Sequence, residues 1–510
     1  MGVDVDVDVD VAVCERPKAS KQIGQTSTSC LQKFTIHFRR PDKLKQNKDA
    51  PYKGQYGFDW LRDEYIYPME TVFYDEYTSK PDPNSPGNWY IPISPLNKTI
   101  ELCINPKKLK EDYLKAVPHQ IKPHSQDYYP AWLSIFACNV QGDNADAGSK
   151  LHEDGVYLDL QLDEIDKIID DRTEIIFKPS DPCLKITPEK ISISEFLKTK
   201  RDSRTLVNNI KQSKIYYYYK LENAVKIICQ GDTLKQHGMI KAFAKLGPIE
   251  YEVGQLMVYH NDEIGKANIV VVNVITKDKN NKKIIPSSPP SLEYILNNQS
   301  FNQALINVEI NVTENFDLVE LYKKTKNEDI NQFLNNVIDP NYLNKDEIEK
   351  EILEKLCEFY DKYGKNRPKN PDKPEEFLGI NNVGHKNTYL LFTEIIMRNG
   401  NSRGFSYVHP TEGPRNSAVI FHNFPDDDIT IPHELAHTFF LLHTYEFHTP
   451  ERFHKFYKGF TDNYMDYPFH LDQAGNPADS KYKGKTYSFF KWQWDEMRND
   501  MSIKIMKRNK

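Results

Sequence analysis

Alternation between apolar and polar residues is the dominant pattern in the first half of the chain. Between residues 33 and 277, short runs of this kind are separated by Pro, Gly, Asn and Asp, which indicates strands joined by turns. The runs predict strands at 33–38, 88–94, 99–104, 155–162, 173–177, 215–220, 255–260 and 268–276. Their spacing is typical of antiparallel sandwiches, so we expect a β-rich, sandwich-like N-terminal half.

Changes in composition and residue pattern divide this half further. Val and Asp alternate strictly through Asp10, and residues 1–30 predict a flexible arm. A slight change near residue 181 indicates a β-rich domain at 31–180 and a β-sandwich-like domain at 181–276. The stretch 277–292 is charged, rich in Pro and Ser and without an apolar period, so it predicts a linker.

The last part of the chain, residues 293–510, mixes the two kinds of period and predicts an α+β domain. Strands are expected at 304–312, 388–397 and 417–423. Helices are expected at 346–364, from about residue 431, and at 488–501. The chain is therefore predicted to be multidomain, as its 510 residues exceed what one hydrophobic core normally organises.

Composition excludes several classes of protein. The 67 basic and 73 acidic residues nearly balance, which leaves no electrostatic footprint for nucleic acid or an anionic membrane. No run approaches 18 apolar residues, so no membrane span is expected. The first 17 residues lack the basic and apolar regions of a secretory signal peptide. The seven cysteines form no CxxC pair, so neither a zinc ribbon nor a disulfide scaffold is predicted, and reduced thiols are expected.

The most informative stretch is IPHELAHTFFLLHTYEFH, residues 431–448. His433 and His437 are four residues apart, so a helix presents both imidazoles to one metal ion. Glu434 lies beside the first ligand and can take a proton from a water without binding the metal itself. Chance produces an HExxH in such a chain only about 0.03 times, which favours a metal site.

A third histidine, His443, lies ten residues after His433. On an unbroken helix it would point about 280° around the axis from His433. It becomes a ligand only if the helix ends near residue 440 and the chain turns back. His448 or Asp462 is the alternative third ligand, and Asp462 would give the His₂-carboxylate set of thermolysin-like sites.

A second motif, TDNYMDY, occupies residues 461–467, and its Met465 lies twenty-eight residues after His437. Together with HExxHxxxxxH, it makes residues 293–510 resemble the metzincin clan of zinc endopeptidases. The resemblance implies Zn²⁺ bound by His433, His437 and His443, with Met465 in a Met-turn beneath the metal. It further implies that Tyr467 ligates zinc or stabilises the oxyanion. It also implies an edge strand, here 417–423, that pairs with the substrate.

The sequence departs from that family at Phe440, where the family has glycine. Glycine there permits a positive φ, which costs a bulky residue about 1–2 kcal/mol. Zinc ligation can offset that strain, or the turn can form at a neighbouring residue. Either way, we expect the helix to end within about two residues of 440.

The function expected from these features is a zinc-dependent endopeptidase with Glu434 as general base. Two alternatives stay open: a non-catalytic zinc-binding structural or adaptor component of a secretion apparatus, and a peptidoglycan-peptide hydrolase. Residues 56–65, YGFDWLRDEY, resemble proteins of Bacteroidetes contractile or type VI-like secretion loci. That resemblance implies an effector or toxin made in the bacterial cytoplasm without a signal peptide and exported by a specialised secretion system. Its partners would be a peptide or protein substrate, the secretion apparatus and an immunity protein.

The remaining polar residues near the motif have ordinary explanations. His448, His454 and His470 are expected at the surface. Asp426–Asp428 precede the zinc helix and are expected to form a solvated loop that favours its positive N-terminal end.

Overall fold

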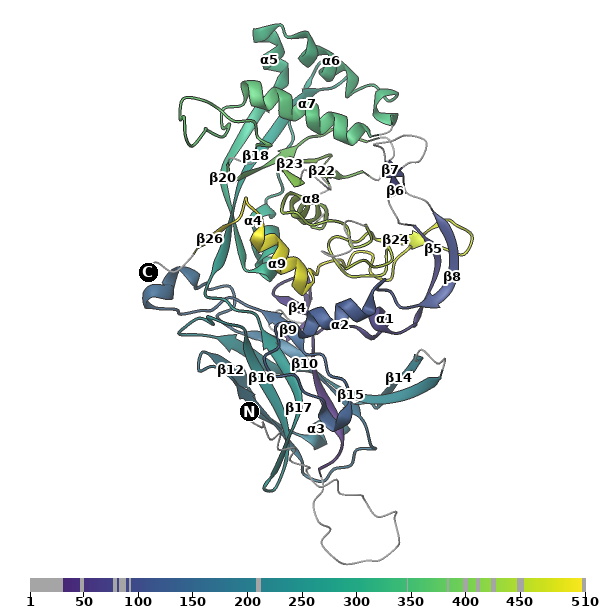
Figure 1. The fold of residues 1–510 in the computed structure, drawn as a ribbon. Helices are drawn as coiled ribbons and strands as arrows, with labels where there is room; N and C mark the ends of the chain where they lie inside the picture. The colour runs from purple at the N-terminus through teal and green to yellow at the C-terminus, as the bar shows by residue number, and fades with distance from the viewer. Residues whose placement is uncertain are drawn as a thin grey trace, which may run out of the picture.

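The computed structural model describes residues 31–45, 50–76, 80–81, 89–90, 93–207, 212–345, 347–382, 385–397, 402–409, 413–422, 428–446 and 454–506. The predicted arm at 1–30 lies outside the described residues. Within them the chain is β-rich and built from several sheets (Figure 1). No helix in this part of the chain is long and apolar enough to cross a bilayer.

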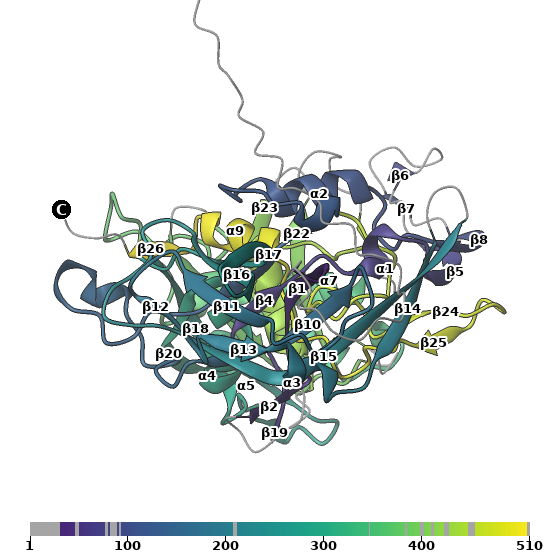
Figure 2. The same cartoon turned by 90° about the horizontal axis from the view of Figure 1, so that it is seen from below.

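The N-terminal half is a sandwich of sheets. One sheet contains β1 (Phe34–Arg39), β10 (Val156–Glu164), β15 (Ser213–Cys229), β12 (Leu184–Thr187) and β14 (Asp202–Val207). The facing sheet contains β13 (Lys190–Ser192), β11 (Glu174–Pro179), β16 (Gly238–Leu246), β17 (Ile249–Val258), β9 (Ala131–Ser134) and β4 (Gly57–Asp59). Alternate residues of both sheets fill the space between them, as Phe34, Ile36 and Phe38 of β1 show. Viewed from below, the sandwich strands β10, β11, β13 and β15 lie in front of the rest of the molecule (Figure 2).

The C-terminal half is organised around a long central strand, β18 (Ile264–Lys277). The strands β20 (Ile306–Asp317), β21 (Asn387–Phe392) and β23 (Gly413–Ile420) continue this sheet in parallel. β22 (Gly404–His409), β19 (Lys283–Ile284) and β26 (Lys504–Met506) join it antiparallel to their neighbours. Ile269 and Val271 of β18 face one core, while Val270, Val272 and Val274 face another, so both sides of the strand are covered.

Helices supply those two covers. α5 (Leu318–Thr325), α6 (Glu328–Asn336) and α7 (Ile348–Tyr363) pack on one face of the sheet. α4 (Leu292–Ile295), α8 (Thr430–Thr438) and α9 (Lys491–Asn499) share the core on the other face. α8 lies near the centre of the view, between α5–α7 and the sandwich (Figure 1).

Short elements complete the described chain. The helices are α1 (Asp63–Ile66), α2 (Pro106–Leu114) and α3 (Ile193–Leu197). The paired strands are β2 (Lys43–Leu44) with β3 (Ala50–Pro51), β5 (Glu70–Asp75) with β8 (Ser94–Ile100), β6 (Lys80–Pro81) with β7 (Trp89–Tyr90), and β24 (Phe469–Leu471) with β25 (Pro477–Asp479). The five cysteines in the described residues are unpaired and buried.

Strand pairing corrects the domain boundaries expected from the sequence. β10 pairs with β15 and β11 with β16, so 31–180 and 181–276 contribute to the same sandwich. β18, which covers the predicted strand 268–276, belongs to the C-terminal sheet instead. The expected linker at 277–292 continues β18 into a hairpin with β19. The continuous apolar run of 268–276 is typical of a strand buried on both faces of a parallel sheet, which is where this strand lies.

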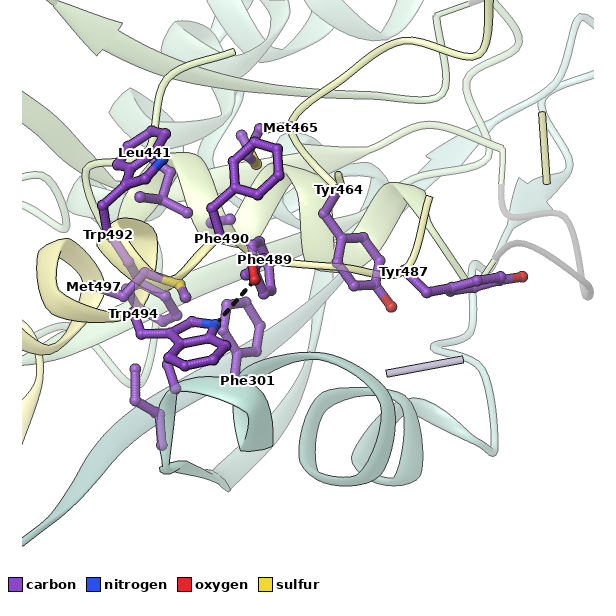
Figure 3. Close-up of a cluster of buried hydrophobic side chains, with 14 of the residues drawn as sticks. Phe301, Leu441, Tyr464, Met465, Tyr487, Phe489, Phe490, Trp492, Trp494 and Met497 are labelled. Carbon is purple, nitrogen blue, oxygen red and sulfur yellow. Dashed lines mark hydrogen bonds between the residues drawn. The ribbon is translucent and has the colours of Figure 1, made fainter. Parts of the chain in front are cut away.

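The two halves also share one hydrophobic core. Trp132 and Met257 of the sandwich belong to the same buried cluster as Leu435, Met465 and Trp494. Figure 3 shows its C-terminal part, where the Trp494 indole N–H donates to the Phe489 carbonyl over 3.1 Å. The part of the chain that carries the histidines is therefore completed by residues of the N-terminal half.

Backbone contacts fix the same junction. The Asn302 side-chain amide donates to the Gly54 carbonyl over 2.9 Å, and the backbone N–H of Lys491 donates to Asp59 over 2.8 Å. Gly54 has φ +82°, and a Cβ there would lie 1.8 Å from the Gln299 carbonyl oxygen. Only glycine fits this approach of the two halves.

Candidate metal centre

α8 carries the first two histidines of the motif. Leu435 and Ala436 bury one side of the helix in the core, and the helix packs against β22 and β23. His433 and His437 lie one turn apart, with ring centroids 4.8 Å apart and perpendicular planes. Both side chains are buried, so the helix presents two imidazoles to one enclosed point, as the sequence predicts.

The end of α8 confirms the predicted turn. The helix ends at Thr438, and Phe440 has φ +70°. The N–H of Phe440 donates to the His437 carbonyl over 3.1 Å, and that of Leu441 to the Ala436 carbonyl over 3.0 Å. This is the Schellman arrangement, with phenylalanine at the left-handed position that glycine normally takes. The chain therefore reverses at residue 440 despite the missing glycine.

The reversal brings His443 back to the first two rings. Its Nε2 lies 3.1 Å from Nε2 of His433 and 3.3 Å from Nε2 of His437. Each Nδ1 faces an oxygen instead: the Tyr464 carbonyl for His433 (2.7 Å), the Leu441 carbonyl for His437 (2.7 Å) and Glu446 for His443 (2.6 Å). Each Nδ1–H donates a hydrogen bond to its oxygen partner, which leaves the three Nε2 lone pairs facing one another.

Three converging lone pairs require a positive charge between them. Within the described residues, His433, His437 and His443 are the one group of three or more side chains that could hold a metal ion. Burial and the neighbouring His443 and His433 hold the pKa of His437 well below its ordinary value, which keeps this ring neutral. Neutral imidazoles with fixed tautomers are the form that binds a metal, so the residues present fit a metal ion.

Glu434 lies beside this cluster and is 8% exposed. It packs against β22, where a Cβ at Gly404 would come within 2.6 Å of its Cγ. A larger residue at Gly404 would therefore displace the Glu434 side chain. The carboxylate is thus held against the last described strand of the sheet.

The turn at Thr461–Tyr467 lies against the cluster, as the motif predicts. The Tyr464 carbonyl accepts from His433, and the Met465 carbonyl accepts from the N–H of Thr444 over 2.9 Å. The Asn463 side chain closes the turn by accepting from the Met465 N–H over 2.9 Å. Met465 is fully buried in the same hydrophobic cluster as Leu441 and Phe490 (Figure 3). Successive carbonyls of this turn thus orient the segments that carry His433 and His443.

Tyr467 reaches the same site. Its ring centroid is 4.9 Å from that of His443 and 6.1 Å from that of His433. Tyr445 stacks on His443, with centroids 4.9 Å apart and planes within 6°, and its ring also lies 5.2 Å from that of Tyr467. Burial raises the pKa of Tyr467 to about 12, so its hydroxyl keeps its proton at neutral pH.

The structure excludes Asp462 as the third ligand. Its carboxylate accepts from Arg40 over 2.6 Å and from Arg62 over 2.7 Å, and Ser488 donates to it over 3.1 Å. Burial opposes ionisation, but the charges of Arg62 and Arg40 outweigh it and lower the pKa of Asp462. The carboxylate is thus an anchor for the sandwich, because Arg40 and Arg62 both belong to the N-terminal half.

Other predicted residues are placed as follows. His448 and Asp426–Asp427 lie outside the described residues. His454 was expected at the surface but is buried and lies 3.4 Å from Asp112, and His470 is half-buried against Phe460. Asp428 was expected in a solvated loop, but its carboxylate forms an ion pair with Lys53 over 2.7 Å.

The expected edge strand also needs correction. The predicted strand 417–423 corresponds to β23, which is internal because it pairs with both β21 and β22. Within the described part of the chain the sheet ends at β22, the strand that touches Glu434. The sequence around 404–409 is short and not strongly apolar, which is why the pattern did not reveal this strand.

Sequence reasoning missed several residues of the site. Glu446 follows His443 by three positions, and an acidic residue so close to a metal-ligand candidate was the available signal. Arg40 and Arg62 gave no local signal, since their partner lies about 400 residues later in the chain.

The sequence matches no protein-family model and no curated protein. The evidence for a metal centre is therefore the convergence of His433, His437 and His443.

Proposed function

We propose that this protein is a zinc-dependent endopeptidase of the metzincin type. The observation that carries the proposal is the approach of the His443 Nε2 to within 3.1 and 3.3 Å of Nε2 of His433 and His437, on the helix that also carries Glu434. Tetrahedral zinc with Zn–N bonds of about 2.0–2.1 Å places its nitrogen ligands about 3.3–3.4 Å apart. Both separations from the His443 Nε2 are therefore close to those of nitrogen ligands on zinc.

The residues around the cluster have distinct roles in this proposal. Bound zinc supplies Lewis acidity. Glu434 accepts a proton from the attacking water and delivers it to the leaving amine. Tyr467, which keeps its proton, donates a hydrogen bond to the oxyanion that develops on the peptide carbonyl. His433, His437 and His443 are held in one tautomer by the Tyr464 and Leu441 carbonyls and by Glu446.

The substrate is expected to add a strand to the edge of the C-terminal sheet. β22 is antiparallel to β23, and Gly404 contacts Glu434. A peptide that pairs with this edge would bring its backbone carbonyls past the carboxylate. A purely structural zinc site has no need of a buried carboxylate at this position, which favours catalysis over an adaptor role.

The test combines metal analysis with digestion of a proteome-derived peptide library. We expect one zinc per chain, which His433→Ala or His437→Ala abolishes because each leaves an incomplete ligand set. His443→Ala should weaken zinc binding far more than His470→Ala, a histidine outside the cluster. Full zinc occupancy in His433→Ala or His437→Ala would show that zinc does not bind at this site.

Glu434→Gln separates catalysis from metal binding. The variant should keep its zinc but lose about 10²–10⁴-fold in cleavage rate, since the amide cannot carry the proton. Cleavage at the wild-type rate would show that another group is the base. Zinc binding without cleavage of any peptide in the wild type would favour the adaptor alternative, and cleavage restricted to peptidoglycan peptides would favour the cell-wall hydrolase.

Export by a specialised secretion system and recognition by an immunity protein stay predictions of the sequence. The stretch that suggested them, residues 56–65, contains buried Tyr56, Phe58 and Arg62. Arg62 binds Asp462, so this stretch also supports the turn beneath the histidines.

A further inference from the structure

Lys458 is a buried lysine surrounded by aromatic rings beside the histidine cluster. Its Nζ lies 4.3 Å from the ring centroid of Phe469, 5.0 Å from that of Tyr467 and 5.7 Å from that of Tyr445. Tyr445 and Tyr467 are the two rings that pack on His443. One ammonium group therefore contacts both aromatic neighbours of the third histidine.

The charge of Lys458 is balanced from the other half of the chain. Glu76, which follows β5, lies 3.1 Å from Nζ, and the two side chains are 8% and 9% exposed. Its second oxygen, Oε1, has no hydrogen-bond partner among the described residues. Burial lowers the pKa of Lys458, and Glu76 opposes that change. The pair is thus largely shielded from water, and its two charges compensate one another.

The backbone next to Lys458 is rigid. Gly459 has φ +79°, and a Cβ there would lie 2.3 Å from the Phe469 carbonyl oxygen. Asp466 accepts from the backbone N–H groups of both Gly459 and Tyr467 over 2.8 Å. The loop that carries Lys458 and the turn that carries Tyr467 are therefore tied to one carboxylate.

We propose that Lys458 is a positioning residue that holds Tyr467 and Tyr445 against His443, with Glu76 as its counter-ion. The catalytic part of this proposal rests on the endopeptidase function proposed above, because it assigns the position of the group that faces the oxyanion. A desolvated ammonium over an aromatic face favours one placement of the ring by up to about 30-fold, which is enough to fix its position. The N-terminal half thereby contributes directly to the order of the site.

The first test measures ring mobility without reference to catalysis. Tetranitromethane nitrates accessible tyrosines, and peptide mapping gives the rate at Tyr467, with the 49% exposed Tyr294 as internal reference. Lys458→Met keeps the aliphatic stem and removes the charge. We expect Tyr467 to be nitrated about 2- to 30-fold faster, the range that corresponds to 0.5–2 kcal/mol of lost cation–π attraction.

The chain offers a matched control and a second variant. Lys481 pairs with Glu70 of β5 and lies 5.2 Å from the Tyr482 ring centroid, so Lys481→Met removes a similar interaction elsewhere and should leave Tyr467 unchanged. Lys458→Met leaves Glu76 buried without its counter-ion and can therefore prevent folding. The double variant Lys458→Met/Glu76→Gln removes both charges and gives the same readout.

The second test uses the zinc-loaded enzyme. The double variant should keep one zinc per chain and lower kcat about 10- to 100-fold, the scale for a misplaced catalytic group, while KM changes less than about twofold. Unchanged nitration of Tyr467 together with unchanged kcat would overturn the positioning role. If the wild type cleaves no peptide but nitration responds as expected, the endopeptidase proposal fails and the positioning role stands.

Discussion

Phe440 provides the sharpest test of how the third histidine is brought into place. Its φ of +70° costs a residue with a Cβ about 1–2 kcal/mol, whereas glycine adopts it freely. Against this, glycine loses about 0.5–1 kcal/mol more than alanine in conformational entropy on folding. Phe440→Gly should therefore be more stable than Phe440→Ala by about 0.5–1 kcal/mol. In ordinary helical geometry the order would be reversed.

Amide hydrogen exchange at the end of α8 measures the difference in stability between the glycine and alanine variants. The Leu441 amide is bonded to the Ala436 carbonyl over 3.0 Å, so its exchange rate reports opening of the helix end. A difference of 0.5–1 kcal/mol corresponds to about two- to fivefold slower exchange in the glycine variant than in the alanine variant. Faster exchange in the glycine variant would refute the left-handed turn and, with it, the placement of His443.

Four further outcomes are expected from the structure. Asp462→Asn should cost about 3–5 kcal/mol in urea unfolding, because it removes the carboxylate with which buried Arg40 and Arg62 both pair. Asp428→Asn, at a more exposed ion pair, should cost under about 1 kcal/mol, and equal costs would contradict the assignment. Glu446→Gln should weaken metal binding about 10- to 100-fold in chelator competition, while Glu394→Gln, which alters an equally short pair with His422 (2.6 Å) outside the cluster, should not. Burial lowers the pKa of His152 from 6.5 to about 4, so the unfolded chain binds a proton that the folded chain does not between these values; the free energy of unfolding then falls as pH falls, and His152→Gln should flatten that dependence by at most about 1.4 kcal/mol per pH unit. A fragment of residues 293–510 lacks β18 and should be insoluble or unfolded, and a soluble, metal-binding fragment would show that the sheet forms without its central strand.

The sequence was most informative where a local pattern of apolar or histidine residues determined the structure by itself. The alternation in 155–162 and the apolar positions of 346–364 predicted β10 and α7 nearly to their ends. The spacing of His433, His437 and His443 likewise predicted the cluster, because helix geometry fixes the first two and the reversal at 440 fixes the third. Local pattern sufficed for these features since no distant residue decides them.

Features that depend on distant partners escaped prediction. The run 268–276 has the same composition whether it lies in a sandwich or a parallel sheet, and only its pairing with β20 and β21 decides. The short helices α5 and α6 were missed because each has only 8 or 9 residues, too few for a clear amphipathic period. The pairing of Glu76 with Lys458 joins residues nearly 400 positions apart, and a single sequence contains no record of such proximity.

The bonds from Arg40 and Arg62 to Asp462 have a consequence for biosynthesis. They span 422 and 400 positions, so the ribosome must make most of the protein before either arginine meets its partner. Domains formed early in synthesis fold first, and the sandwich strands through β17 end at Val258, well before α8 is made. The histidine cluster is thus among the last features that a nascent chain can assemble. A chain that ends before Asp462 therefore lacks the anchor that holds the turn beneath His433, His437 and His443.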